Sequence, residues 1–164
     1  MQAGFGETGP GTNAPGFNNF SGGAAVTPDY PIEIYDEDKQ AFERLLVEVQ
    51  DAYGKEDYAR LRERTTPEIM SFFAEELGQN ASNGRRNQVS DTRLIDAEVA
   101  EAWQEGSMDY ATIAMRYESI DVMVDRSSGA VIEGDPHHAT QATELWTFVR
   151  EEGGPWYLSA VQEA

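Results

Sequence analysis

The sequence predicts an α+β domain in which helices near its N-terminus cover one face of an antiparallel sheet. Apolar residues recur at helical spacing between residues 36 and 77, which is typical of amphipathic helices. From Gln88 onward the pattern changes to runs rich in β-branched and aromatic residues, separated by turn residues. The chain ends in two such runs, 143–150 and 156–162, joined by a short glycine-containing loop, which predicts a hairpin.

Composition limits the classes of function. The chain has 164 residues, enough for one domain, and carries 30 acidic against 12 basic residues, a formal net charge of -18. This excess of acid argues against binding the phosphate backbone of nucleic acids and against charge-driven attachment to an anionic lipid surface. The sequence has no apolar run of about 18 residues, so it predicts no transmembrane segment. The absence of cysteine removes disulfides, thiolate nucleophiles and cysteine metal sites.

Residues 1–31 are dominated by Gly, Pro, Asn, Ser and Thr, a composition that cannot bury enough apolar surface to offset its ordering entropy. We therefore expect a flexible linker over 1–31 and a folded domain over 32–164. A linker at the start of a chain indicates a fragment of a longer protein, and an ordinary disordered tail is the alternative.

The first helix is predicted to begin at Asp36, a capping residue followed by more acid in the first turn. Gly54 is expected to end this helix. Its outer face carries acid rather than lysine and arginine, so it is expected to pack on protein. Its apolar stripe consists of Phe42, Leu45, Leu46, Val49 and Tyr53.

A second, short helix is predicted over 55–64. A third is predicted from Thr66 as the capping residue, with Pro67 at the first helical position. Its apolar stripe consists of Ile69, Phe72, Phe73 and Leu77.

Strands are predicted over 89–103 and over 109–117, the second of which continues or bends into 120–125. Residues 131–132 fit a short return strand. In the strand 143–150, Trp146 and Phe148 share one face, because side chains alternate along a strand. Long strands that curve around a helix layer form a cone, a common place for an apolar pocket.

The run Thr-Glu-Leu-Trp-Thr-Phe-Val-Arg over 143–150, with Glu-Gly-Asp at 133–135 before it, is the most specific motif of the chain. The helix segment 42–46, the helix start 66–70 and the ending 156–162 add weaker motifs. Through these motifs, residues 36–162 resemble the Tim44-like domain family. This resemblance implies a cystatin-like, nuclear-transport-factor-two-like cone without catalytic activity or cofactor.

The resemblance also implies partners and a location. Mitochondrial members of this family tether the import motor chaperone to the translocation channel at the inner membrane. By analogy, the chain is expected to bind a protein partner at a bacterial inner membrane, peripherally or through an upstream anchor. Its role would be that of a scaffold in protein translocation or membrane protein assembly.

An apolar pocket inside the cone is the candidate binding site. It would take a partner's side chain, a hydrophobic ligand or a lipid chain. Glu144 shares a face with Trp146 and Phe148 and is the polar candidate of this pocket. The apolar lining is predicted to be Phe72, Phe73, Met115, Tyr117 and Trp146.

The alternative is a small-molecule or lipid carrier, or an enzyme, that uses the same pocket. An enzyme would need an acid or base such as Glu144, with Asp135, His137 or His138 from the preceding loop. The structural alternative for Glu144 is an ion pair with a nearby arginine, the candidates being Arg93, Arg116 and Arg150. Adjacent histidines in a loop are a poor chelate, so no metal site is expected.

Overall fold

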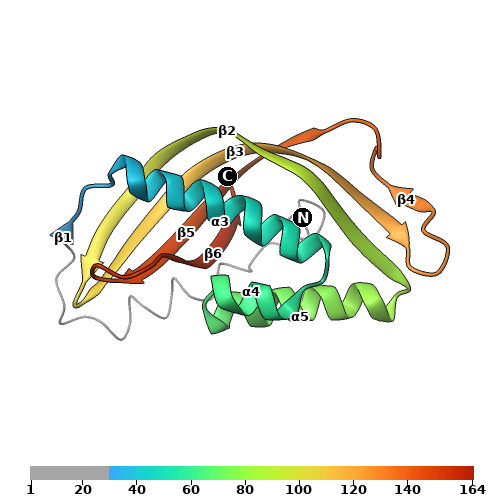
Figure 1. Cartoon of the computed structure of the whole chain (residues 1–164), viewed down its shortest axis with the longest axis horizontal. Coiled ribbons are helices and arrows are strands. Elements are labelled where there is room, and N and C mark those ends of the chain that lie inside the picture. Colours follow the sequence, from blue (N-terminus) through green and yellow to red (C-terminus); the bar gives the residue numbers. More distant parts are fainter. Residues whose placement is uncertain (1–29) are drawn as a thin grey trace.

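The computed structural model describes residues 30–164, so most of the linker predicted over 1–31 lies outside the described residues. Within them, helices lie along the concave side of a strongly curved antiparallel sheet (Figure 1). This is the α+β arrangement that the order of helical and strand patterns predicts.

The three helices of the described chain are α3 (Asp36–Gly54), α4 (Tyr58–Arg64) and α5 (Pro67–Ser82). Helix α3 begins one residue after its capping residue, Tyr35, so the expected cap at Asp36 is corrected by one position. The carboxylate of Asp38 accepts a hydrogen bond from the backbone N–H of Tyr35 at 3.0 Å and closes this end of the helix.

The predicted helix 55–64 is shorter in the structure. Asp57 caps α4 by accepting a hydrogen bond from the backbone N–H of Arg60 at 3.1 Å. Before it, Glu56 has a φ of 54°, a left-handed conformation that interrupts a helix. Helix α5 begins as predicted, with Thr66 at the cap and Pro67 first in the helix.

The sheet runs in the order β1-β2-β3-β5-β6, and β4 pairs with β3 beside this path. All pairs are antiparallel. The predicted strand 109–125 is one continuous strand, and the strand predicted over 89–103 extends at both ends. The bounds are β1 (Tyr30–Pro31), β2 (Arg85–Glu105), β3 (Met108–Asp125), β4 (Val131–Glu133), β5 (Thr140–Glu151) and β6 (Tyr157–Glu163).

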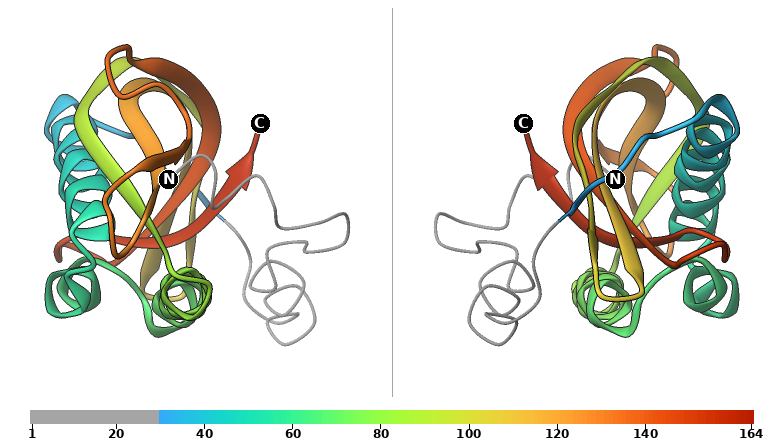
Figure 2. Two further views of the ribbon diagram at one scale, coloured as in Figure 1. Left: turned by 90° about the vertical axis from the view of Figure 1, so that its right-hand side faces the viewer. Right: turned by 90° about the vertical axis from the view of Figure 1, so that its left-hand side faces the viewer.

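The core lies between α3 and the concave face of the sheet, and α3 runs along one side of the curled strands (Figure 2). Phe42 of α3 stacks on Phe148 of β5 with ring centroids 4.4 Å apart, and meets Trp156 edge-on at 5.0 Å. The alternate residues Ala111, Ile113, Met115 and Tyr117 of β3 face the same core. The cone is therefore filled by large side chains along this part of its length.

Gly54 ends α3 as expected, and the packing of the helix on the sheet also requires a glycine at this position. It belongs to the helix, and a Cβ atom there would lie 2.8 Å from both the backbone N and the backbone O of Val89 in β2. A contact this short brings helix and strand backbones together, which only glycine allows.

A buried charge cluster fixes the start of α3 to the sheet. Arg150 of β5 donates to Asp38 at 3.2 Å and to Asp109 of β3 at 2.9 Å. The indole N–H of Trp156 donates to the same oxygen of Asp38 at 3.1 Å, and the Arg150 guanidinium lies 4.3 Å from the Trp156 ring centroid. We call Asp38, Asp109, Arg150 and Trp156 the basal clamp.

Candidate functional site

The predicted pocket residues come from three elements and face one interior. Phe73 of α5, Met115 and Tyr117 of β3, and Trp146 of β5 are at most 1% exposed and belong to one hydrophobic cluster. Phe72 is partly buried and packs against that cluster. The structure brings these side chains together as a packed wall, with Glu144 in the same interior.

Glu144 is buried, with 2% of its surface exposed. One of its oxygens, Oε1, accepts hydrogen bonds from the Tyr117 hydroxyl at 2.6 Å and from the Trp146 indole N–H at 2.9 Å. The predicted ion pair with an arginine is therefore wrong. Arg93 pairs with Glu118, and Arg150 belongs to the basal clamp.

The sheet register explains why Glu144 pairs with Tyr117 and not with an arginine. Glu144 lies directly opposite Met115, and Tyr117 lies opposite Ala142, two residues away on the same face. A diagonal cross-strand neighbour is within reach of a long aromatic side chain. The hydroxyl of Tyr117 therefore reaches the carboxylate where the sequence indicated an arginine.

Helix α3 adds two polar side chains to this interior. The Gln50 amide donates to the Tyr117 hydroxyl at 3.2 Å, and the Tyr53 hydroxyl donates to Glu76 of α5 at 3.0 Å. Sequence reasoning missed Gln50 and Glu76. The signal was present for Gln50, a polar residue at helical spacing within the apolar stripe of Leu46, Val49 and Tyr53.

Burial dominates the electrostatics of this group. Desolvation raises the pKa of Glu76 to about 7, with a smaller contribution from the charge of Glu144. Desolvation also raises the pKa of Glu144, although the hydrogen bonds from Tyr117 and Trp146 act in the opposite direction. Burial raises the pKa of both tyrosine hydroxyls, so they stay protonated and act as donors.

The histidine loop does not join this interior group. His137 and His138 are exposed, and the His138 ring pairs with Asp135 at 2.8 Å. The backbone N–H of His137 and the His138 side chain hold the pKa of Asp135 below its usual value. No cluster of three or more potential metal ligands occurs in residues 30–164.

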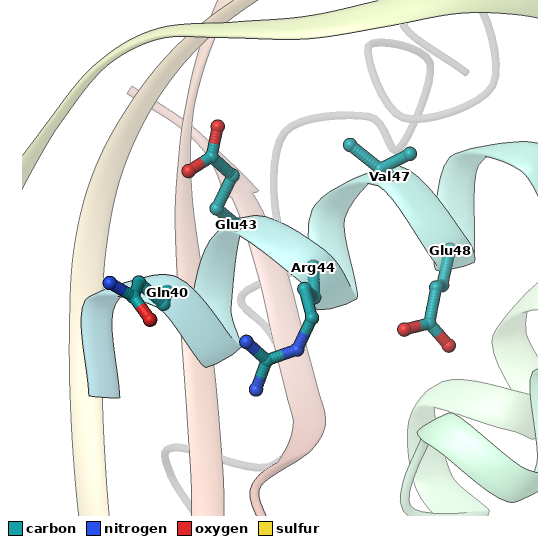
Figure 3. Close-up of a pocket in the computed structure, with 5 residues that line it drawn as sticks. All are labelled: Gln40, Glu43, Arg44, Val47 and Glu48. Atoms are coloured by element: carbon teal, nitrogen blue, oxygen red, sulfur yellow. The ribbon is translucent and has the colours of Figure 1, made fainter. Parts of the chain in front are cut away.

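A separate hollow of about 410 Å³ lies on the outer side of α3 and is largely open (Figure 3). Among the described residues its lining comes from α3 alone, as one stripe of polar side chains around an exposed valine. These residues are Gln40, Glu43, Arg44, Val47 and Glu48. The hollow does not contain any of the predicted pocket residues.

The fold defines the class first. Helices on the concave side of a curved antiparallel sheet, with aromatic residues filling the space between them, form the cystatin-like, nuclear-transport-factor-two-like cone. The chain belongs to the Tim44-like domain family, whose model matches residues 36–163. Proteins of this family are membrane-associated, interact with other proteins and are generally non-catalytic.

Solved structures give further likenesses. The intermembrane space region of the chloroplast protein ARC6 has a TM-score of 0.49 at 11% identity, over 76% of this chain and 96% of that one. A conserved protein from Planctomyces limnophilus DSM 3776 has a TM-score of 0.42 at 18% identity, over 79% and 100%. A comparison with curated proteins gives no match.

Proposed function

We propose that this chain is a non-catalytic protein-binding module that acts as a scaffold or tether at a bacterial inner membrane. Its task would be protein translocation or membrane protein assembly. The observation that carries this proposal is the match of the Tim44-like domain to nearly the whole described region, residues 36–163. None of the described helices is long and apolar enough to cross a membrane. We propose attachment that is peripheral or that uses a segment upstream of the domain.

One feature of the domain supports binding over catalysis. The histidines lie on an exposed loop, and Glu144 is buried in the interior. A general base must come within hydrogen-bond reach of its substrate, so an acid and a base on different parts of the fold do not make a catalytic pair.

The test is in-cell crosslinking of the full-length protein, followed by mass spectrometry of the membrane fraction. We expect crosslinks to channel, chaperone or assembly proteins of the inner membrane. Recovery of the protein only from the soluble fraction, without any protein crosslink, would contradict the proposal.

A carrier or enzyme that uses the cone interior is the second candidate. The observation in its favour is the pair of interior carboxyl groups, because strongly perturbed pKa values cluster at functional sites. Organic extraction of the purified full-length protein would release a bound lipid or small molecule if this candidate is correct. A turnover that Glu144→Gln abolishes in a folded protein would favour the enzyme.

A further inference from the structure

The interior of the cone contains a group of polar side chains that is rich in hydrogen-bond acceptors. Its members come from four elements, namely α3, α5, β3 and β5. We call this group the interior acceptor cluster, which consists of Gln50, Tyr53, Glu76, Tyr117 and Glu144.

The hydrogen bonds inside the cluster leave one buried acceptor without a donor. The single hydroxyl proton of Tyr117 is used on Glu144, so Tyr117 can only accept from the Nε2 of Gln50. The Oε1 of Gln50 then has no hydrogen-bond partner among the described residues, although Gln50 is 0% exposed. A buried polar atom in this state costs about 1–3 kcal/mol.

Rotating the Gln50 amide does not remove this deficit. The amide oxygen would then face the oxygen of Tyr117, whose proton already points at Glu144. The cluster therefore needs a donor from outside it.

The two carboxylates of the cluster also have no basic side chain as a partner in the described part of the chain. No lysine or arginine among residues 30–164 forms a salt bridge with Glu76 or Glu144, although other carboxylates of the domain have such partners. A metal ion fits poorly, because two carboxyl groups fall short of the ligand number that oxygen-binding cations require. A primary ammonium supplies both missing features, since it is a cation with three donors.

We propose that the interior acceptor cluster binds a primary ammonium group, the ε-ammonium of a lysine on the partner polypeptide. This inference rests on the proposed function and names the chemistry of the partner. The ammonium would donate to Gln50 Oε1 and to the carboxylates of Glu76 and Glu144. Glu76 is only partly buried and marks the entry. The apolar side chains of Phe73, Leu77 and Met115 belong to the core beside it and suit a lysine's methylene stem.

Binding should depend on pH, because a protonated carboxyl attracts a cation less. Glu76 has a pKa of about 7, so the ammonium site should weaken as pH falls through this value. The other acidic groups that act on this cluster come from several elements. They are Glu75 on α5, Asp121 on β3 through its effect on the tyrosines, and Glu163 on β6.

The probe for this site is n-butylammonium chloride, titrated into the full chain and followed by NMR. The Trp146 indole N–H is the reporter, since it donates to Glu144, and a Trp146→Phe variant assigns its resonance. About one unit above the pKa of Glu76 we expect a saturable shift, absent with n-butanol or with sodium chloride.

Glu76→Gln removes one charged acceptor at the entry, where the fold should tolerate it. Loss of a charge-assisted hydrogen bond predicts binding that is about tenfold weaker. Glu75→Gln is the matched control, because Glu75 is exposed on the same helix, and it should bind as the parent does. A parent without a saturable shift, or equal affinity of Glu76→Gln and Glu75→Gln, would overturn the proposal.

The crosslinking experiment separates this inference from the proposed function. If Glu76→Gln recovers membrane partners as efficiently as the parent, the ammonium site is wrong and the binding module stands. If butylammonium binds but no protein partner is found, the site takes a free alkylamine, and the lysine of a partner is excluded.

Discussion

The burial of Glu76 makes the stability of the fold depend on whether its carboxyl group is protonated. Its pKa is raised from 4.5 to about 7, so the folded chain holds this proton more tightly than the unfolded chain. The stability that results is fully present below pH 4.5 and is lost as pH rises through 7. Allowing for solvent screening of a partly exposed group, about 1–3 kcal/mol is at stake.

Glu76→Gln should abolish this dependence, because glutamine keeps an acceptor for Tyr53 and has no charge to desolvate. In urea unfolding, the free energy of unfolding of the parent should fall relative to that of the variant as pH rises from 4.5 through about 7. Glu75→Gln, an exposed neighbour, should show no such difference. A stability difference between Glu76→Gln and the parent that stays constant with pH would refute the assignment.

Tyr117 joins Gln50 to Glu144, so removing its hydroxyl takes one hydrogen bond from each of these buried side chains, although Glu144 keeps its bond from Trp146. Tyr117→Phe should lower the free energy of unfolding by about 1–3 kcal/mol. Tyr157→Phe is the control, since Tyr157 is 38% exposed and should change stability by less than about 0.5 kcal/mol. Equal denaturation midpoints for the two variants would show that the hydroxyl network is not stabilising.

Two helical glycines offer a matched test at the scale of elements. A Cβ at Gly54 would lie 2.8 Å from the backbone of Val89, whereas a Cβ at Gly78 would meet nothing within 4 Å. Gly54→Ala should cost about 2 kcal/mol, because helix α3 or strand β2 must move. Gly78→Ala should stabilise α5 by about 0.5–1 kcal/mol through helix propensity. Thermal unfolding would measure both, and a stabilising Gly54→Ala would contradict the close packing.

The basal clamp gives a second test at this scale. Asp38→Asn removes the charge that Arg150 contacts at the start of α3. We expect a loss of about 1.5–3 kcal/mol in denaturant unfolding, the range for a hydrogen bond to a charged group. Glu37→Gln, exposed one residue earlier, should be close to neutral. If both variants are neutral, the clamp does not hold the helix to the sheet.

Local signals explain which elements could be predicted. The capping residue Thr66 and the first helical residue Pro67 are adjacent, so the start of α5 can be recognised in the sequence. The late start of α4 is less visible, because Glu56 has a left-handed conformation and pairs with Arg126, which follows the end of β3. Such long-range contacts leave no local pattern.

The same limit applies to the interior. The shared face of Glu144 and Trp146 follows from alternation along one strand, so the burial of Glu144 could be expected. Its partner Tyr117 depends on the register of β5 against β3, and Glu76 depends on the packing of α5. Neither register nor packing can be read from spacing alone.

At the scale of the whole molecule, the sheet shows how the domain avoids unspecific association. Within residues 30–164, β2 has only the two-residue β1 on its outer side, which leaves a long sheet edge in this part of the chain. Its pairing with β3 shifts register at three places, between Ser90 and Arg93, Leu94 and Asp96, and Val99 and Glu101. Bulges and charged side chains protect an edge from pairing with other chains. A partner is therefore expected to bind through side chains rather than by adding a strand.

The measurement that tests the central claim most directly is site-specific photo-crosslinking of the full-length protein in cells. The crosslinker would replace Gln79, which is exposed on α5 near the entry marked by Glu76, and Val131 on the exposed β4 would serve as the comparison position. The account predicts protein adducts in the membrane fraction from position 79, and fewer from position 131. Absence of protein adducts from both positions, with the protein recovered only in the soluble fraction, would contradict it.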